Sequence, residues 1–127
     1  MKIFKSKWFS RFARQSGIED QELCTAVNRA EQGFIDADLG GNVIKQRIAR
    51  INQGKSGGFR SIILFRIEEK SFFVYGFPKN QRDNITRQEL KGFKKLAKDM
   101  SIVDDGQLLQ LIQEGEFIEV RCHDKNI

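Results

Sequence analysis

Apolar residues recur at helical spacing in two segments near the start of the chain. The first, residues 6–15, is followed by Gly17, a residue type that commonly ends a helix. The second, residues 19–33, carries acidic residues in its first turn, where the helix dipole favours negative charge. The pattern therefore predicts two N-terminal helices. Their apolar faces consist of Trp8, Phe9, Phe12, Ala13, Leu23, Ala26, Val27 and Ala30.

The pattern changes after these helices, where residues 34–41 form an irregular connection that ends in two glycines. Three runs then combine alternation with β-branched and aromatic residues, and a short connection of hairpin length joins the last two. We therefore expect a mainly antiparallel sheet. The three runs are residues 43–51, 59–67 and 71–77, and residues 53–58 and 68–70 connect them.

Two more helices and a last strand are predicted near the end of the chain. Thr86 and Glu89 have the spacing of a capping box, a shorter amphipathic helix spans residues 104–113, and residues 116–121 are strand-like. Without internal repeats or disordered linkers, residues 1–127 are expected to form one α+β domain. It should have two N-terminal helices packed on a mainly antiparallel sheet of three to five strands, with C-terminal helices. The expected core contains Phe9, Phe12, Leu23, Val27, Ile63, Phe65, Phe73, Leu90 and Phe93.

Charge is distributed unevenly along the chain, which has a net charge of +5. Residues 39–67 contain Lys and Arg but no Asp or Glu, residues 79–98 are again mostly basic, and acidic residues gather after position 104. A basic middle and an acidic end favour a polyanionic partner bound to one face. Basic residues that only keep the surface solvated would produce the same composition.

The composition argues against a membrane protein and against a metal site. No apolar run approaches the roughly 18 residues that span a bilayer, and no signal core follows the basic start, so a cytoplasmic location is expected. Cys24 and Cys122 lack metal-type spacing, so we expect two reduced thiols, with that of Cys24 buried and inert. No metal or other cofactor is expected.

Two segments could carry chemistry. Residues 53–60 resemble a phosphate-binding loop, but they lead into a strand instead of a helix, which disfavours an ATPase. They would instead form an exposed basic turn that brings Lys55 and Arg60 near a phosphate, or an ordinary hairpin. Residues 75–85 form a polar loop before a helix N-terminus, which favours anions. With His123 in the tail and no catalytic triad, catalysis would rest on Lys and Arg.

Three ordered motifs resemble those of the RelE-type toxins, in particular a HigB-like branch. They are GFIDADLGG at residues 33–41, GKSGGFR at 54–60 and FFVYGFPKNQRDNI at 72–85. The helix around Trp8 and the sequence GEFIEV at 115–120 fit the same branch. The resemblance implies a toxin that cleaves mRNA on the ribosome, where a 2′-hydroxyl attacks its own phosphate. The implied partners are mRNA, the ribosome and an antitoxin, usually a helix-turn-helix protein.

The resemblance also assigns roles to individual residues. Arg60, which follows a Gly-Gly-aromatic turn, matches the arginine that contacts the scissile phosphate in such toxins. Some relatives have a tyrosine after the basic loop, but Ile85 and Thr86 stand there and Tyr75 lies within a strand. Related ParE-type toxins poison gyrase, so a protein target and an inactive RNA-binding relative remain alternatives. The implied catalytic residues are Arg60, Lys79 and Arg82, and the implied RNA-binding residues are Lys45, Arg47, Lys55 and Asn80.

Overall fold

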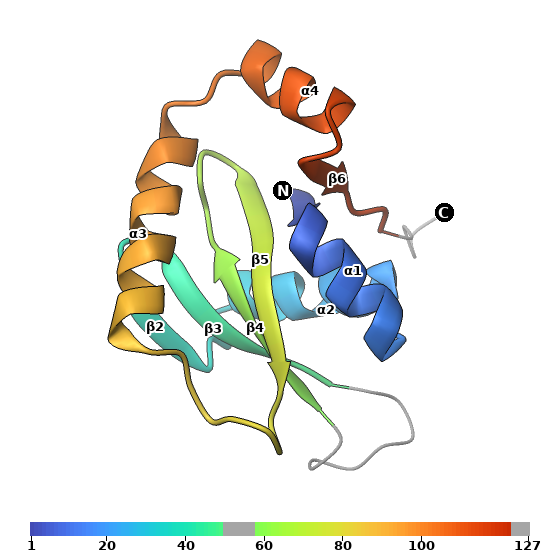
Figure 1. Cartoon of the computed structure of the whole chain (residues 1–127), viewed down its shortest axis with the longest axis vertical. Coiled ribbons are helices and arrows are strands. Elements are labelled where there is room, and N and C mark those ends of the chain that lie inside the picture. Colours follow the sequence, from blue (N-terminus) through green and yellow to red (C-terminus); the bar gives the residue numbers. More distant parts are fainter. Residues whose placement is uncertain (50–57, 123–127) are drawn as a thin grey trace.

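A mixed sheet forms the centre of the computed structural model, which describes residues 1–49 and 58–122 (Figure 1). Local signals set its helices, because Ser6 caps α1, Gly17 ends it with a φ of 69°, and capping boxes open the other three. The elements are β1 (Lys2–Ser6), α1 (Lys7–Ser16), α2 (Asp20–Glu31), β2 (Ala37–Gly40), β3 (Val43–Ile48), β4 (Phe59–Leu64), β5 (Lys70–Pro78), α3 (Arg87–Ser101), α4 (Asp105–Gln113) and β6 (Phe117–Glu119).

The described sheet has six strands in the order β2-β3-β4-β5-β1-β6. The expected α+β class with a mainly antiparallel sheet is confirmed, but the range of three to five strands was too low. The sequence pattern missed β1, which pairs in parallel with β5 and antiparallel with β6, and β2, which lies inside the expected connection. Both are short, and their pairing depends on partners that periodicity does not identify.

Each face of the sheet carries its own apolar core. One core lies under α1 and α2 and includes Phe9, Leu23 and Phe73, while the other lies under α3 and α4 and includes Ile62 and Leu64. The expected core residues are buried apart from Phe12, Leu90 and Phe93, which are partly buried and pack against the edges of these cores. The chain thus forms a three-layer arrangement, with helices on both faces (Figure 1).

The second expected run, residues 59–67, ends earlier than its apolar pattern suggests. β4 stops at Leu64, and the backbone of Phe65 donates to the carbonyl of Asn42 at 2.7 Å. Arg66, Glu68 and Glu69 then take positive φ angles of 57°, 49° and 65°, so the turn is longer than residues 68–70. The other expected connection, residues 53–58, lies almost wholly outside the described residues, as do His123 and the end of the run 43–51.

The two cysteines are not free thiols, contrary to expectation. Cys24 on α2 and Cys122 after β6 form a disulfide across a Cα–Cα distance of 5.8 Å. The chain after β6 is held close to α2 because Val120 N donates to the Ile3 carbonyl and Arg121 N donates to Asp20 Oδ2. A separation of 98 residues hides this proximity from sequence patterns. Within residues 1–49 and 58–122, no helix is long and apolar enough to cross a membrane.

Candidate functional site

Two arginines face each other across the central hairpin of the sheet. Arg47 on β3 is the Cα partner of Arg60 on β4. Side chains alternate along strands, and Ile44 and Ile48 belong to the core under α1 and α2, so Arg47 points to the opposite face. Ile62 belongs to the core under α3 and α4, and Arg60 is two positions before it on β4, so Arg60 points to the same face as Arg47. We call Arg47 and Arg60 the arginine pair.

The arginine pair lacks compensation in the part of the chain that the structure describes. Nε of Arg47 and Nη1 of Arg60 are buried and have no hydrogen-bond partner there. Like charges on opposite strand positions destabilise a sheet, and a buried donor without a partner costs about 1–3 kcal/mol. An anion with several oxygens would remove both costs, because guanidinium groups bind phosphates with two parallel hydrogen bonds.

Gly58 makes room for one member of the pair. A Cβ atom at this position would lie 3.2 Å from Nε of Arg47 and 3.3 Å from the carbonyl of Ile48. The glycine that precedes the Phe59-Arg60 step therefore lets the Arg47 guanidinium lie along the backbone at the start of β4. This is a local reason for the GG sequence in the 54–60 motif, in addition to any turn that it forms.

The third basic residue of interest, Arg82, is already paired. Its Nη2 donates to Glu89 Oε1 at 2.6 Å and its Nη1 donates to the Tyr75 hydroxyl at 3.0 Å. The guanidinium also lies over the Phe77 ring, 5.4 Å from its centroid. The hydrogen bond from Arg82, followed by that from the Thr86 backbone, lowers the pKa of Glu89 to about 2. In return, the hydrogen bond to Glu89 raises the pKa of Arg82 above its usual value.

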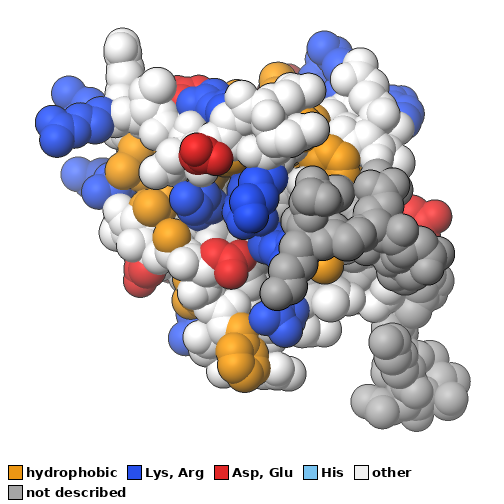
Figure 2. Space-filling view, turned by 90° about the horizontal axis from the view of Figure 1, so that it is seen from below, with side chains coloured by type: hydrophobic (Ala, Val, Ile, Leu, Met, Phe, Trp, Pro, Cys, Tyr) orange, Lys and Arg blue, Asp and Glu red, His pale blue; other side chains and the backbone are white. Residues whose placement is uncertain are grey.

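Three of the remaining predicted residues lie in elements next to the arginine pair. Lys45 is two positions from Arg47 on β3 and shares its face. Lys79 and Asn80 are exposed in the turn after β5, and the backbone of Lys79 donates to the Gly58 carbonyl at 3.4 Å, which ties this turn to the start of β4. Lys55 lies outside the described residues. Figure 2 shows the molecule from below the view of Figure 1. Lys and Arg side chains gather at the middle of this surface, with acidic side chains on either side.

Sequence patterns did not identify every residue of this face. Tyr75 was noted only as a strand residue, yet it holds Arg82 and lies across from Ile62, two positions from the Cα partner of Arg60. Strand alternation could have placed it there, because Tyr75 and Phe77 share a face. Lys94 of α3 lies against the β2–β3 turn, 3.4 Å from a Cβ built on Gly40, and only the fold brings it there.

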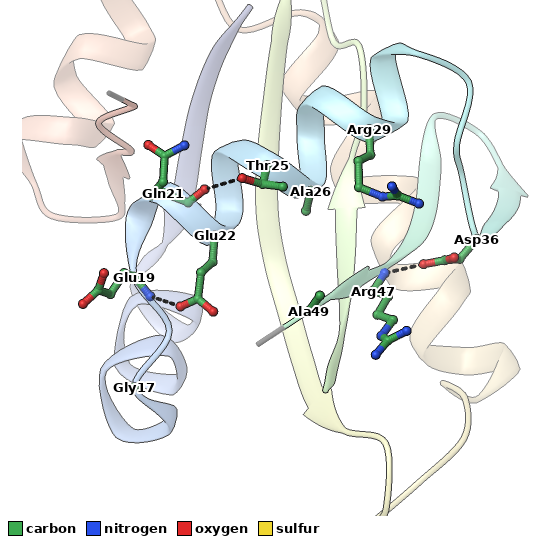
Figure 3. A pocket seen from close by; sticks show the side chains of 10 residues that line it. All are labelled: Gly17, Glu19, Gln21, Glu22, Thr25, Ala26, Arg29, Asp36, Arg47 and Ala49. Atoms are coloured by element: carbon green, nitrogen blue, oxygen red, sulfur yellow. Dashed lines mark hydrogen bonds between the residues drawn. The ribbon is translucent and has the colours of Figure 1, made fainter. Parts of the chain in front are cut away.

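A cavity of about 890 Å³, which has Arg47 in its lining, lies between α2 and the end of β3 (Figure 3). Glu19, Glu22 and Asp36 bring three carboxylates to its lining, whereas Arg29 and Arg47 bring two guanidinium groups. Asp36 accepts a hydrogen bond from the backbone of Arg47, and in Figure 3 the Arg47 side chain points away from α2. This balance of charges suits a polyanion less well than the arginine pair does, so we place the candidate site on the other face.

The ion pair between Arg82 and Glu89 predicts a specific loss of stability in acid. The pKa of Glu89 is depressed to about 2. The contribution of the ionised Glu89 carboxylate to the free energy of unfolding is therefore complete above the usual carboxyl pKa of about 4.5, and it is lost as pH falls through about 2. Urea unfolding at pH 7 and pH 2.5 should show that Glu89→Gln removes on the order of 1 kcal/mol at pH 7 and only a minor part of that at pH 2.5, which is close to the folded-state pKa. Asp99→Asn breaks an exposed pair with Lys95 on the same helix and should change little at either pH. Equal effects of Glu89→Gln at both pH values would contradict the ionic role.

Comparison with known proteins gives one result that covers almost the whole chain. A family model described as the RelE toxin of the RelE / RelB toxin-antitoxin system matches residues 1–120. The matched region extends from β1 to the end of β6 and contains the arginine pair. A search among curated proteins found no match.

Proposed function

Because the chain belongs to the RelE toxin family of toxin–antitoxin systems, we propose that it cleaves mRNA on the ribosome and thereby stops translation. The observation that carries this proposal is the arginine pair, in which each guanidinium has one buried donor atom without a partner in residues 1–49 and 58–122. A site that is stabilised when it binds an oxyanion suits the phosphate of an RNA backbone. We further propose that the protein falls into a HigB-like branch, on the strength of its three ordered motifs.

In the proposed reaction, the 2′-hydroxyl oxygen of one nucleotide attacks the adjacent phosphorus. The new bond joins O2′ to phosphorus and the 2′-hydroxyl loses its proton, while the bond from phosphorus to O5′ breaks and O5′ takes up a proton. The products are a 2′,3′-cyclic phosphate and a 5′-hydroxyl. Negative charge builds on the non-bridging oxygens in the transition state, where fixed cations are most effective. We assign this stabilisation first to Arg60, with Lys79 at the rim.

Arg82 is the third catalytic residue that we propose, and its ion pair defines the part it plays. Glu89 already neutralises its guanidinium at 2.6 Å, so its charge acts on a phosphate more weakly than that of Arg60. Its stronger effect is to fix the Tyr75 hydroxyl and the loop after β5. The proposed RNA contacts are Lys45, Arg47, Lys55 and Asn80.

Toxins of this family act with an antitoxin, and we propose a helix-turn-helix protein with an acidic segment that covers the basic face. The other proposed partners are the ribosome and its mRNA, and no cofactor is required. We propose the cytoplasm as the place of action because translation occurs there. The Cys24–Cys122 disulfide is the observation that favours a more oxidising compartment.

If Lys45 contacts an RNA phosphate, its removal should change the salt dependence of binding. We expect Lys45→Ala to weaken binding of single-stranded RNA and to flatten the slope of log K against log salt by about 0.7 for each lost phosphate contact. Fluorescence anisotropy of a labelled oligonucleotide between low and moderate salt measures this slope. Lys95→Ala, which removes an exposed lysine paired with Asp99 on α3, is the matched control. An unchanged slope for Lys45→Ala would identify Lys45 as a solvated charge.

The decisive experiment for the function is induction of the protein in bacteria that lack its antitoxin, followed by mapping of mRNA 5′ ends. We expect growth arrest, cuts within translated regions and loss of those cuts when initiation is blocked beforehand. Arrest without cuts, together with trapped gyrase on DNA, would instead support a protein target. Neither arrest nor cuts, with RNA binding retained, would support an inactive RNA-binding relative.

A further inference from the structure

An aromatic side chain lies open at the surface beside the candidate site. Trp8, in the first turn of α1, is 44% exposed, an unusual fraction for an indole that also packs against other rings. Its ring centroid lies 4.7 Å from that of Tyr75 and 5.5 Å from that of Phe12. The indole therefore contacts two aromatic rings, while a large part of its surface faces solvent.

The support beneath Trp8 is rigid. The Ser6 side chain caps α1 by accepting from Phe9 N at 3.0 Å, which fixes the first turn against β5 (Figure 1). Gly76 allows this close approach, because a Cβ there would lie 2.5 Å from Cε2 of Phe12. Tyr75 is held in turn by its hydrogen bond from Arg82 and by the Phe93 ring at 5.8 Å. The indole thus rests on side chains whose positions are already fixed.

The register of the sheet places this surface next to the arginine pair. Tyr75 is the Cα partner of Ile62, and Phe77 is the Cα partner of Arg60. Tyr75 therefore lies on the strand next to that of Arg60, and neighbouring strands are about 5 Å apart. Along the strand direction it is two residues from Phe77, the partner of Arg60, which is a distance on the order of 7 Å. A phosphate held by Arg47 and Arg60 would leave the base of a neighbouring nucleotide within reach of the Tyr75–Trp8 surface.

We propose that Trp8 is a stacking platform for one RNA base, positioned by Tyr75 beside the phosphate that the arginine pair binds. The proposal deepens the proposed function and rests on RNA being the ligand of this face. Sequence-tolerant recognition of single-stranded RNA combines a basic surface for the backbone with an aromatic face for a base, and both occur here. A tryptophan that served only to cover the core would gain more from full burial than from partial exposure.

Fluorescence tests this inference directly because Trp8 is the one tryptophan of the chain. We expect a 2′-O-methyl single-stranded RNA, which cannot be cleaved at its 2′ position, to quench the intrinsic tryptophan emission of the full protein as it binds. Inorganic polyphosphate should bind the basic face without comparable quenching, because it has no bases. Binding of the RNA, measured by anisotropy of a 5′ label, with no change in tryptophan emission would overturn the proposal.

Substitutions provide a second readout that does not depend on emission. We expect Trp8→Leu to weaken RNA binding roughly 5- to 150-fold, the range for loss of one stacked base, and Trp8→Phe to restore most of it. Phe34→Leu is the matched control, since Phe34 is 58% exposed and packs under Arg29 after α2, on the side of the sheet that α2 covers. Thermal unfolding of each variant verifies the fold. If a folded Trp8→Leu variant bound RNA as tightly as the unsubstituted protein, Trp8 would not be a stacking platform.

The two proposals fail in different ways. Ribosomal mRNA cuts by the unsubstituted protein, combined with no quenching and no loss of affinity in Trp8→Leu, would overturn the stacking platform and leave the nuclease intact. Quenching and an affinity loss without any mRNA cuts would support the stacking platform and overturn the nuclease.

Discussion

Arg60→Ala is expected to reduce ribosome-dependent mRNA cleavage roughly 100- to 1,000-fold, equivalent to about 3–4 kcal/mol of transition-state stabilisation. The reason is that Arg60, the second residue of β4, lies within a paired strand and presents a buried guanidinium nitrogen with no partner among the described residues. Arg60→Lys should recover little, because an ammonium group cannot hold two phosphate oxygens in the planar geometry of a guanidinium. Growth on induction and counts of mRNA 5′ ends measure the effect.

The same substitution should leave the fold as stable as before, or make it slightly more stable. It removes one of two like charges on opposite strand positions, and with it a buried donor that has no partner among the described residues. Arg66→Ala is the matched control for activity, because Arg66 lies after β4, over the Phe65 ring and near the carbonyl of Glu31. It should cleave normally. A loss of more than about 1 kcal/mol in urea unfolding of Arg60→Ala would show that Arg60 supports the sheet instead.

Phe73→Ala is expected to destabilise the protein by about 3–5 kcal/mol, the usual cost of removing a buried phenyl ring. Phe73 has no exposed surface, and its ring centroid lies 5.2 Å from that of Phe9, so it joins α1 to the middle of β5. The free energy of unfolding of a typical domain is only about 5–15 kcal/mol, so this substitution would remove a large part of it. The midpoint of urea denaturation measures the change.

Phe34→Ala, at an exposed position, provides the comparison and should cost less than about 0.5 kcal/mol. A similar small cost for Phe73→Ala would mean that the core under α1 and α2 closes around the missing ring. Because Phe73 contacts the side of the sheet opposite the arginine pair, any loss of cleavage by a folded Phe73→Ala protein would follow from stability and not from altered chemistry.

Signals that act over a few residues predicted most of the elements. The spacing of Thr86 and Glu89 identified the start of α3, and the observed hydrogen bonds join the Thr86 backbone N to Glu89 Oε1 and Glu89 N to Thr86 Oγ1. The alternation over residues 43–51 likewise predicted the strand that the structure shows as β3. Period and capping are local properties, so a single sequence is enough to recognise them.

Contacts between distant segments were beyond the reach of those signals. The pattern of residues around Ile3 and Phe4 does not indicate that β5 and β6 are the strands that pair with β1. The disulfide between Cys24 and Cys122 likewise depends on the position of the chain after β6. The pairing of Arg82 with Glu89 was missed for a different reason. Their interval of seven residues spans a loop and a helix start, where no fixed period relates side chains.

The place of β1 in the sheet has a consequence for the order in which the protein can be completed during synthesis. β1 precedes every other element, yet Ser6 pairs with Phe117 and Lys2 pairs with Lys70. A chain that emerges at about 5–20 residues per second therefore exposes β1 for seconds before β5 arrives, and longer before β6 does. An open strand edge is where another polypeptide can add a strand. The newly made protein thus offers a site for strand addition that the finished sheet has closed.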